Sequence, residues 1–474
     1  MRKYILGGAT LLAGAILLGS QMRRYRLKKS PQHVSQTEAS YRQARLRILI
    51  LGAGFGGLAT ALTLDQQMKR VPECSILLVE RDNDLLFTPL LWTAANGRTS
   101  PNNVVVPIRN FQRRRRFHVL HAEVASIDID RKEVQTSAGP RPYDILVIAL
   151  GSYTAIPDLP GVRANALPFH TPADALQLRN HLIDAIETAH QTEDVQERRA
   201  WLTFVVGGAG DTGIELAAII HDYLMAGLFR AYPWLVHEVV RIVVIGRSER
   251  VVPTSKPQTS RLVHQVLERQ GIEILTGTTI TAATEKTVET SAGVIAARTF
   301  FWAAGIAPSD VVRQVPVPHA SNGSIIVDDY LRIAEHPEIY VIGDAAWAYD
   351  ATGAPVPATA QAARLEGNYV GETIAAEYAK GPTQPYHYRT LGHLALLGHY
   401  TGVAELGPLT FDGLPAFLLW HLAYLLRNPS WRRRIRLLVD WLLSATLGRE
   451  IGQLRLGTAH LPLALVREKA KGVV

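Results

Sequence analysis

Two glycine-rich segments, each following a short apolar run, constrain this chain most strongly. The first, LGAGFGG, contains Gly52, Gly54 and Gly57, and the second, VGGAGDTG, contains Gly208, Gly210 and Gly213. In a strand-turn-helix unit the first glycine permits the tight turn, the second lets backbone approach a pyrophosphate, and the third lets the helix pack on the strand. The spacing therefore predicts an α/β fold with two Rossmann-like units, each able to bind a dinucleotide.

The residue that ends the next apolar strand differs between the two units. After the first segment this strand is SILLVE and ends in Glu80, an acid that can accept hydrogen bonds from a ribose diol. After the second segment the equivalent position is Gly246, followed by Arg247 and Arg250. An acid would repel a 2′-phosphate, whereas arginine can pair with one. Both NADH and NADPH therefore remain candidates for the second unit, and the alternative is that Arg247 only faces solvent.

An uncharged segment runs from Tyr4 to Ser20, with Arg2 and Lys3 before it and a basic cluster from Arg23 to Lys29 after it. Its length is at the short end of what spans a bilayer. The positive-inside rule places the remaining chain on the cytoplasmic side. We expect a retained anchor in the cell (inner) membrane; the alternative is a helix that lies on the membrane surface or packs on the protein.

A second apolar and basic region lies near the C-terminus, where Leu414 to Leu426 is too short to span a bilayer and precedes Trp431 and a group of arginines. Such a segment is suited to the lipid headgroup layer. It could equally pack on the core or form a homodimer interface, so a homodimer stays open. The net charge of +8 lies largely beside these apolar segments, which favours a lipid bilayer over nucleic acid as partner. We expect the further run from Arg113 to Arg116 to be a solvated or lipid-facing loop.

The chain contains one cysteine, Cys74. A single cysteine excludes an intramolecular disulfide, a cysteine-based metal cluster and a redox-active dithiol. We predict no metal site, and enzymes that need paired cysteines beside a flavin, such as sulfide:quinone oxidoreductases, are excluded.

Several segments together resemble the type II NAD(P)H:quinone oxidoreductases, a family of single-subunit, non-proton-pumping flavoenzymes. They are LGAGFGGL, the run from Phe87 to Leu91, GAGDTGIEL, FFWAAGIAPS, VIGDAA, the run from Ala360 to Ala363, and the tail NPSWRRRIRLLVDWLL. The resemblance extends from about Arg47 to the C-terminus, and its tail is the most discriminating part. It implies non-covalent FAD, a hydride from NADH or NADPH, and a membrane quinone as electron acceptor at the cytoplasmic face of the membrane.

The resemblance also implies roles for individual residues. Glu215, near the nicotinamide, and Gln361, by flavin and quinone, are the expected catalytic residues. The expected cofactor-binding residues are Gly52, Gly54, Phe55, Gly56, Gly57, Glu80, Thr88, Pro89, Val124, Gly151, Gly208, Gly210, Gly213, Arg247, Gly305, Asp344 and Ala345.

This sequence departs from the family pattern at three places. Leu365 replaces a second glutamine on the quinone side, the turn near the flavin reads Ala149-Leu150-Gly151, and Gly246 replaces the acid that selects NADH. A non-quinone acceptor, or a membrane-tethered redox sensor, therefore stays open as an alternative function.

The expected organisation inserts the second Rossmann-like unit into the first. We expect a membrane anchor and linker at 1–44, an FAD-binding domain at 45–165 and 310–395, an NAD(P)H-binding domain at 166–309, and amphipathic, membrane-associating helices at 396–474.

Overall fold

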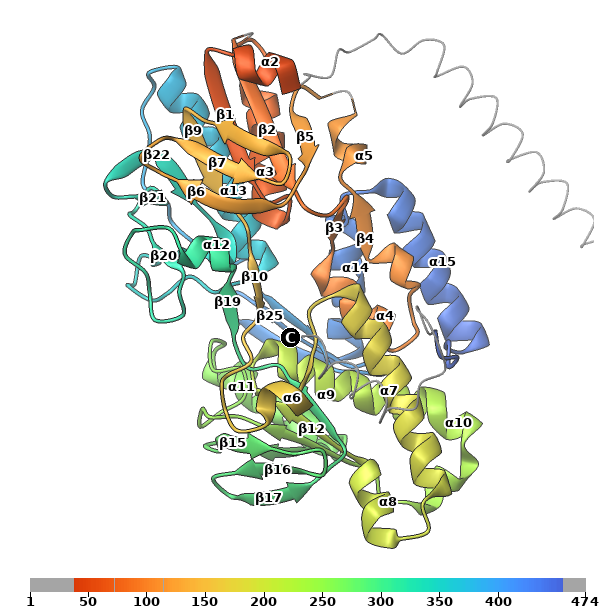
Figure 1. Cartoon of the computed structure of the whole chain (residues 1–474). Coiled ribbons are helices and arrows are strands. Elements are labelled where there is room, and N and C mark those ends of the chain that lie inside the picture. The colour runs from red at the N-terminus through yellow and green to blue at the C-terminus, as the bar shows by residue number, and fades with distance from the viewer. Residues whose placement is uncertain (1–37, 72, 114, 455–474) are drawn as a thin grey trace, which may run out of the picture.

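The computed structural model describes residues 38–454 except 72 and 114, and it contains two large sheets flanked by helices (Figure 1). The first sheet has the strand order β21-β22-β9-β1-β2-β5. Its central strand β1 (Leu46–Leu51) pairs in parallel with β2 (Cys74–Glu80) and β9 (Ile145–Ile148), and all three are largely buried. The sheet is completed by β5 (His118–His121), β22 (His336–Val341) and β21 (Arg332–Ile333). Continuous apolar runs become central parallel strands because both of their faces are covered.

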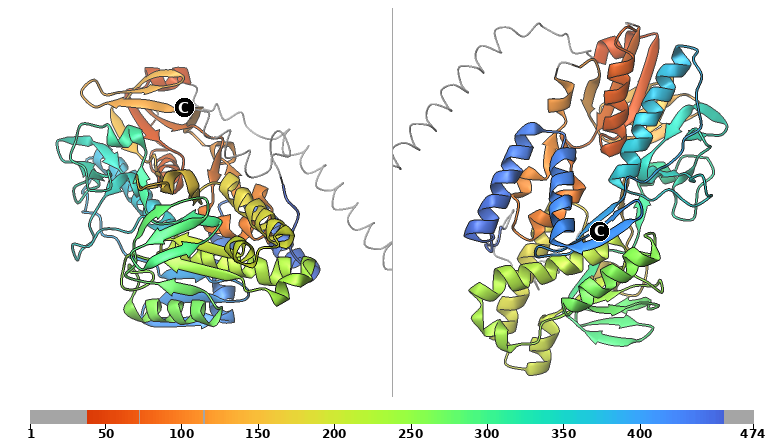
Figure 2. Two further views of the ribbon diagram at one scale, coloured as in Figure 1. Left: turned by 60° about the horizontal axis from the view of Figure 1, so that its bottom comes forward. Right: turned by 180° about the vertical axis from the view of Figure 1, so that it is seen from behind.

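Helices α3 (Phe55–Gln67) and α13 (Ala360–Tyr378) lie side by side against this sheet (Figure 2). Their close approach depends on small residues. A Cβ on Gly367 would lie 2.2 Å from the carbonyl oxygen of Gly56, and one on Gly371 would lie 2.8 Å from Cβ of Thr63. Segments about 300 residues apart in the chain therefore form one layer.

The second sheet has the order β11-β18-β12-β13-β14, and its strands are parallel. They are β11 (Leu167–Pro168), β18 (Thr299–Trp302), β12 (Thr203–Gly207), β13 (Arg241–Ile245) and β14 (Glu273–Leu275). The main helices of this unit are α7 (Pro172–Gln191), α9 (Asp211–Tyr223) and α11 (Pro257–Arg269). Both predicted strand-turn-helix units are confirmed.

The chain passes between the two units at β10 (Ser152–Thr154) and β19 (Ile306–Pro308), which pair antiparallel. Every strand of the second large sheet lies between these two strands in sequence, whereas β22 returns to the first sheet. This topology supports an insertion of the second unit into the first. The limits of the domains remain a proposal.

A three-stranded antiparallel sheet, which we did not predict, follows the first unit: β24 (His393–Leu396), β25 (Gly402–Leu406) and β26 (Leu409–Gly413). It leads into helices α14 (Leu414–Arg427) and α15 (Trp431–Leu447), and β25 lies between the two units (Figure 1). Because β24 begins at His393, we propose to move the domain limit at 396 to a position before this strand.

The remaining elements are short. Small sheets join β3 (Asp84–Leu86) to β4 (Val105–Pro107), β6 (Val124–Asp128) to β7 (Glu133–Thr136) and β8 (Gly139–Pro142), β15 (Ile280–Ala283) to β16 (Thr287–Thr290) and β17 (Gly293–Ala296), and β20 (Ile325–Ile326) to β23 (Ala346–Trp347). The short α-helices are α2 (Glu38–Gln43), α4 (Leu91–Ala95), α5 (Arg109–Gln112), α6 (Val162–Asn165), α8 (Val195–Trp201), α10 (Phe229–Ala231) and α12 (Asp310–Arg313).

The basic run from Arg113 to Arg116 does not behave as the expected solvated or lipid-facing loop. Arg115 pairs with the buried Asp65 at 3.1 Å. The Arg116 guanidinium donates to the carbonyl oxygens of Met68 at 3.1 Å and Val71 at 3.2 Å. These carbonyls lie at the C-terminal end of α3 and beyond it, where backbone acceptors lack helical partners. That expectation was therefore wrong for the second half of the run.

The predicted anchor from Tyr4 to Ser20 lies outside the described residues. Within 38–454, no helix is both long enough and apolar enough to cross a bilayer.

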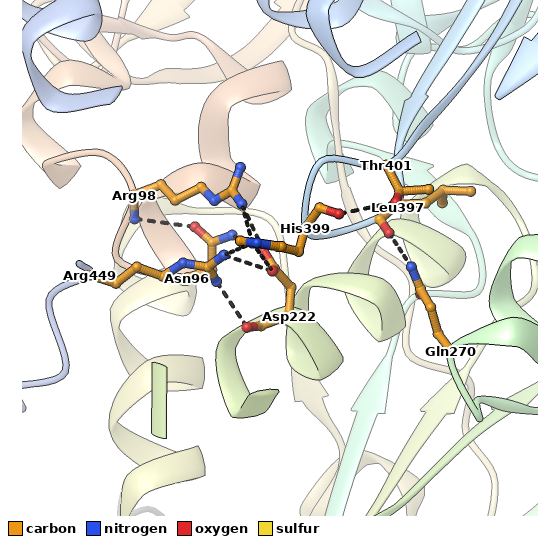
Figure 3. A network of polar contacts seen from close by, with 8 residues as sticks. All are labelled: Asn96, Arg98, Asp222, Gln270, Leu397, His399, Thr401 and Arg449. Carbon is orange, nitrogen blue, oxygen red and sulfur yellow. Dashed lines mark hydrogen bonds and ion pairs between the residues drawn. The ribbon is translucent and has the colours of Figure 1, made fainter. Parts of the chain in front are cut away.

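A buried ionic network joins four parts of the chain that are distant in sequence (Figure 3). Asp222, in α9, is fully buried and pairs with Arg449 at 2.7 Å and with Arg98 at 3.6 Å. Asn96 donates to the same carboxylate at 3.1 Å, and Nδ1 of His399 lies 3.3 Å from both guanidiniums. The segment after α15 is thereby held against the second unit and against the loop that follows α4.

We predict that Asp222→Ala lowers the free energy of unfolding by about 3–5 kcal/mol, because it leaves two buried arginines without their carboxylate. Denaturant unfolding followed by tryptophan fluorescence measures the loss. The matched control is Asp412→Ala, which breaks the more exposed Arg269–Asp412 pair and should cost less than about 1 kcal/mol. Equal losses for the two variants would contradict a structural role for the network.

Candidate functional site

The first glycine-rich turn joins β1 to α3, and the space available for a Cβ differs between its three glycines. Gly52 has φ of +94°, and a Cβ there would lie 2.3 Å from the carbonyl oxygen of Ala149. A Cβ on Gly57 would lie 1.9 Å from the carbonyl oxygen of Gly52. At Gly54, the N-cap of α3, no described atom beyond its own chain neighbours lies within 4 Å of the Cβ position. This open space beside a helix N-terminus fits a pyrophosphate.

Glu80, at the end of β2, lies against the same turn. Its Oε2 accepts a hydrogen bond from the Ala53 N–H at 2.6 Å, and its Oε1 accepts from the Asp82 N–H at 3.1 Å. The carboxylate is thus at the place where a ribose diol binds in a Rossmann unit.

The second glycine-rich turn, between β12 and α9, repeats this geometry. Gly208 has φ of +129°, and its Cβ would lie 2.6 Å from the carbonyl oxygen of Ala303. A Cβ on Gly213 would lie 1.7 Å from the carbonyl oxygen of Gly208, and the Cβ position of Gly210 is again open to 4 Å. The chain therefore has two glycine turns of the same geometry, Gly52–Gly57 and Gly208–Gly213, which we call the first and the second cradle.

Gly246 occupies the register position that Glu80 has in the first unit, because Gly207 pairs with Ile245 as Leu51 pairs with Val79. A Cβ on Gly246 would lie 2.4 Å from Cβ of Ala209. A larger residue there therefore pushes against the cradle, so a substitution at Gly246 does not isolate the effect of charge. Arg247 is exposed.

Asp344 lies in the 3₁₀ turn Gly343–Ala345, directly after β22. Its Oδ2 accepts from the Ser152 hydroxyl at 2.5 Å. The Gly343 N–H donates at 2.5 Å to Glu366, a carboxyl of α13 that is 3% exposed and whose burial raises its pKa to about 7. Glu366 was missed at the sequence level, because nothing in the pattern of α13 marks this acid as buried.

Gly151 and Gly305 lie at the two crossings between the units. Their φ angles are +65° and +98°, which favour glycine, and no protein atom lies within 4 Å of either Cβ position. The Gly305 carbonyl accepts from the Ala155 N–H at 3.2 Å. These two predicted residues determine the backbone direction at the start of β10 and of β19, the strands that connect the units.

Glu215 lies in α9, just beyond the second cradle. Its Oε1 accepts from the Leu396 N–H at 2.9 Å. Burial, and secondarily the charge of Asp211, raises the pKa of Glu215 to about 8. Asp211 itself pairs with Nε2 of His393 at 2.6 Å. Two contacts therefore connect the start of α9 to β24, and His393 was missed because it lies 182 residues from its partner.

Gln361 is at the N-terminal end of α13, where its Nε2 donates to the Thr390 hydroxyl at 3.4 Å. Leu365 is half-buried one turn further along the same helix.

A row of aromatic side chains connects α3 to α14. The rings of Phe55 and Phe87 are 5.6 Å apart, and those of Phe87 and Tyr424 are 6.4 Å apart. Burial raises the pKa of the Tyr424 hydroxyl, and the nearby charge of Glu215 acts in the same direction. Tyr424 was not predicted, since its position depends on how α14 packs.

The other predicted residues are distributed around the first cradle and its neighbouring elements. Phe55 and Gly56 begin α3, Thr88 and Pro89 lie in the 3₁₀ turn Thr88–Leu90, Val124 begins β6, and Ala345 ends the turn that contains Asp344. Two cradles in one chain, with a protonatable acid and a row of aromatic rings beside them, suit electron transfer between a dinucleotide pair and a third reactant.

We predict that Glu215→Gln becomes increasingly stabilising relative to the native protein as pH rises. A carboxyl whose folded pKa is raised stabilises the fold at low pH and loses that contribution as pH rises from about 4.5 to about 8. Melting temperatures at pH 5, 7 and 9 measure the effect: the gap between variant and native protein should widen up to about pH 8 and then stay constant. Glu193→Gln, at an exposed position, corrects for the loss of one carboxylate. Parallel pH curves for native protein and Glu215→Gln would contradict the burial of this acid.

Comparison with known proteins shows which family models and relatives the chain matches. Residues 46–367 match the family described as pyridine nucleotide-disulphide oxidoreductase, and residues 390–450 match the NDH2 C-terminal domain. The chain is 30% identical to the type II NADH:quinone oxidoreductase NdhA of Mycobacterium tuberculosis, over 93% of this chain and 96% of that protein. It is 31% identical to the demethylphylloquinone reductase NdbB of Synechocystis, over 84% and 96%.

A solved structure, NDH2 from Plasmodium falciparum in complex with NADH, has the same fold. Its TM-score is 0.76 at 20% identity, covering 85% of this chain and 99% of that one. By its matched domains and its curated relatives, the chain belongs to the type II NADH:quinone oxidoreductases, within the pyridine nucleotide-disulphide oxidoreductase family.

Proposed function

We propose that this protein is a membrane-associated flavoenzyme that oxidises a reduced nicotinamide nucleotide, NADH or NADPH, and reduces a membrane quinone without pumping protons. The observation that carries the proposal is the pair of cradles, each open at its second glycine, in one chain. The chemistry that bound FAD supplies is acceptance of a hydride from the nucleotide and release of two electrons to the quinone. The name of one relative, NADH:quinone oxidoreductase, supports both substrates, and the name of another, demethylphylloquinone reductase, supports a quinone as acceptor.

The first cradle is the proposed FAD site. Gly52 and Gly57 shape the turn, Gly54 leaves room for the pyrophosphate, and Glu80 exchanges its bond to the Ala53 N–H for bonds to ribose hydroxyls. Asp344, oriented by Ser152, is the proposed contact to the ribityl and phosphate region. The further proposed contacts are Phe55, Gly56, Thr88, Pro89, Val124, Gly151, Gly305 and Ala345.

The second cradle is the proposed nicotinamide nucleotide site, with Glu215 near the nicotinamide. Its raised pKa keeps this carboxyl protonated at neutral pH, so it is able to donate a hydrogen bond or a proton. Reduction of a quinone to a quinol consumes two protons, and the hydride of the nucleotide accounts for only one of them. Glu215 is therefore the proposed holder of the second proton.

The proposed quinone side comprises Gln361, Phe87 and Tyr424. The aromatic row offers apolar surface to a quinone ring, and Gln361 and the Tyr424 hydroxyl are possible hydrogen-bond partners for its carbonyl oxygens. Leu365 has no amide group, so a bound quinone would receive fewer hydrogen bonds here than from the two glutamines of the family pattern. This departure is the observation in favour of the second candidate, a non-quinone acceptor or a redox-sensing role.

Membrane association is proposed from helix α15, an amphipathic helix whose apolar face is exposed. Leu442 is 64% exposed and Leu447 is 82% exposed. The polar Asp440 instead faces the protein, where it accepts from the Ser100 N–H at 2.9 Å and from the Asn103 amide at 2.7 Å.

Helix α14 adds a row of exposed leucines at four-residue spacing: Leu414, Leu418, Leu422 and Leu426. An apolar surface of this kind, beside the arginines that follow Trp431, suits the headgroup layer of the cytoplasmic face. A homodimer is the other way to cover it, and the segment from Tyr4 to Ser20 is the proposed additional anchor.

We predict that Gly54→Ala folds but loses FAD, because a methyl group there meets no protein atom and instead occupies the space for the pyrophosphate. Gly210→Ala should retain FAD and bind NADH at least about 10-fold more weakly. Flavin absorbance per chain and NADH titration measure both effects. Gly57→Ala is the steric control and should fail to fold, since its Cβ would collide with the Gly52 carbonyl. Retention of FAD by Gly54→Ala would refute the assignment of the first cradle.

The function itself is tested by oxidation of NADH and of NADPH with protein reconstituted in anionic vesicles, with and without a menaquinone or ubiquinone analogue. We expect quinone-dependent turnover, flavin reduction by NADH alone under anaerobic conditions, and no acidification or alkalinisation of the vesicle interior beyond that of a protein-free control. Flavin reduction without reoxidation by quinone would favour the second candidate function.

A further inference from the structure

The two cradles share their glycine geometry but differ in what lies at the end of the neighbouring strand. At the first cradle Glu80 accepts a hydrogen bond from the Ala53 N–H. At the second cradle Gly246 occupies the position of Glu80, and no carboxylate accepts from Ala209 among the hydrogen bonds of the described residues. The group that binds a free ribose 2′-hydroxyl, and repels a 2′-phosphate, is therefore absent from the second cradle.

We infer that the second cradle is selective for NADPH, and that Arg247 and Arg250 bind its 2′-phosphate beside Gly246. This inference rests on the proposed function only in taking the second cradle as the nicotinamide nucleotide site.

The loop that carries both arginines is held directly against the cradle. The Val252 N–H donates to the Ala209 carbonyl oxygen at 2.8 Å, and Val251 and Val252 are fully buried. Val252 has φ of +39°, an unusual conformation for a β-branched residue, which the surrounding packing must maintain. The loop is therefore a fixed part of the site, attached to the turn of the second cradle through its backbone.

Both arginines have guanidinium N–H donors that no described residue accepts from. Arg250 donates from Nη2 to the Pro253 carbonyl at 2.6 Å, whereas its Nη1 is enclosed and has no hydrogen-bond partner within the described chain. Arg247 is exposed and makes no hydrogen bond or ion pair with any residue that the structure describes. If the Arg250 side chain turns outward to a bound phosphate, its Nη1 donates to a phosphate oxygen. Charge-assisted hydrogen bonds of this kind are among the strongest that a side chain forms.

One carboxylate lies in the same loop. Glu249 is exposed, and its Oε1 would lie 3.4 Å from a Cβ on Gly277, so this side chain is at the turn after β14. Two guanidiniums against one carboxylate leave the loop with a net positive charge, which favours the phosphorylated nucleotide.

The test uses the purified holoenzyme and two probes, 2′,5′-ADP (adenosine 2′,5′-bisphosphate) and 5′-AMP, which differ only at the 2′-phosphate. Calorimetric titration should show 2′,5′-ADP binding at least about 10-fold more tightly, and kcat/KM should favour NADPH over NADH by a similar factor. Arg247→Gln, at an exposed position that the fold does not need, should remove about 10-fold or more of the affinity for 2′,5′-ADP and raise KM for NADPH. Its kcat and its affinity for 5′-AMP should stay within about 2-fold.

Two further variants complete the test. Arg250→Lys keeps the charge but loses the planar guanidinium, and it should weaken the binding of 2′,5′-ADP more than that of 5′-AMP. Arg199→Gln removes an exposed arginine of α8, near the opposite end of β12, and should change neither probe. Equal affinity for the two probes, or an Arg247→Gln variant that binds 2′,5′-ADP as the native protein does, would overturn the inference. Selective binding of 2′,5′-ADP without quinone turnover would leave the inference standing and defeat the proposed function instead.

Discussion

The close approach of the third glycine to the carbonyl of the first is the contact on which both cradles depend. A Cβ would lie 1.9 Å from that oxygen at Gly57 and 1.7 Å from it at Gly213, so only glycine lets the helix start directly over the turn. With the helix in this position, its unpaired N–H groups and its dipole face the open side of the second glycine. The anion-binding character of both sites therefore follows from backbone packing and does not require a charged side chain.

Helix α9 extends this constraint from the second cradle to the C-terminal region. At its start, Asp211 and Glu215 contact β24 through His393 and the Leu396 N–H. At its end, Asp222 is buried against Arg449, which follows the exposed helix α15. The nucleotide side of the molecule and the surface proposed to contact the membrane are thus attached to the same helix, which fixes the position of one relative to the other.

The parts of the fold that follow local rules were predictable from sequence. Apolar strands, glycine turns and the helices after them are specified by residues within about 20 positions of one another, and both units appear as expected. The β24–β26 sheet was not predictable in this way, since its strands are short and are covered by elements from other parts of the chain.

The site divides along the same line. Gly52, Gly54 and Gly57 form a local cluster, and Glu80 follows at the spacing that a strand-turn-helix-strand unit sets, so this spacing carried the information. The buried state of Glu366, the pairing of His393 with Asp211 and the position of Tyr424 depend on tertiary contacts that follow no such motif spacing, and a single sequence contains no signal for them. The collision expected between a Cβ at Gly246 and Ala209 was likewise invisible before the two strands were placed side by side.

The most direct test of the central claim is an experimental structure of the protein with FAD and a nicotinamide nucleotide bound together. The account predicts the FAD pyrophosphate over Gly54, with Glu80 turned from the Ala53 N–H to the ribose hydroxyls, and the second nucleotide over Gly210 with its nicotinamide near Glu215. FAD over Gly210, or a single dinucleotide spanning both cradles, would contradict it.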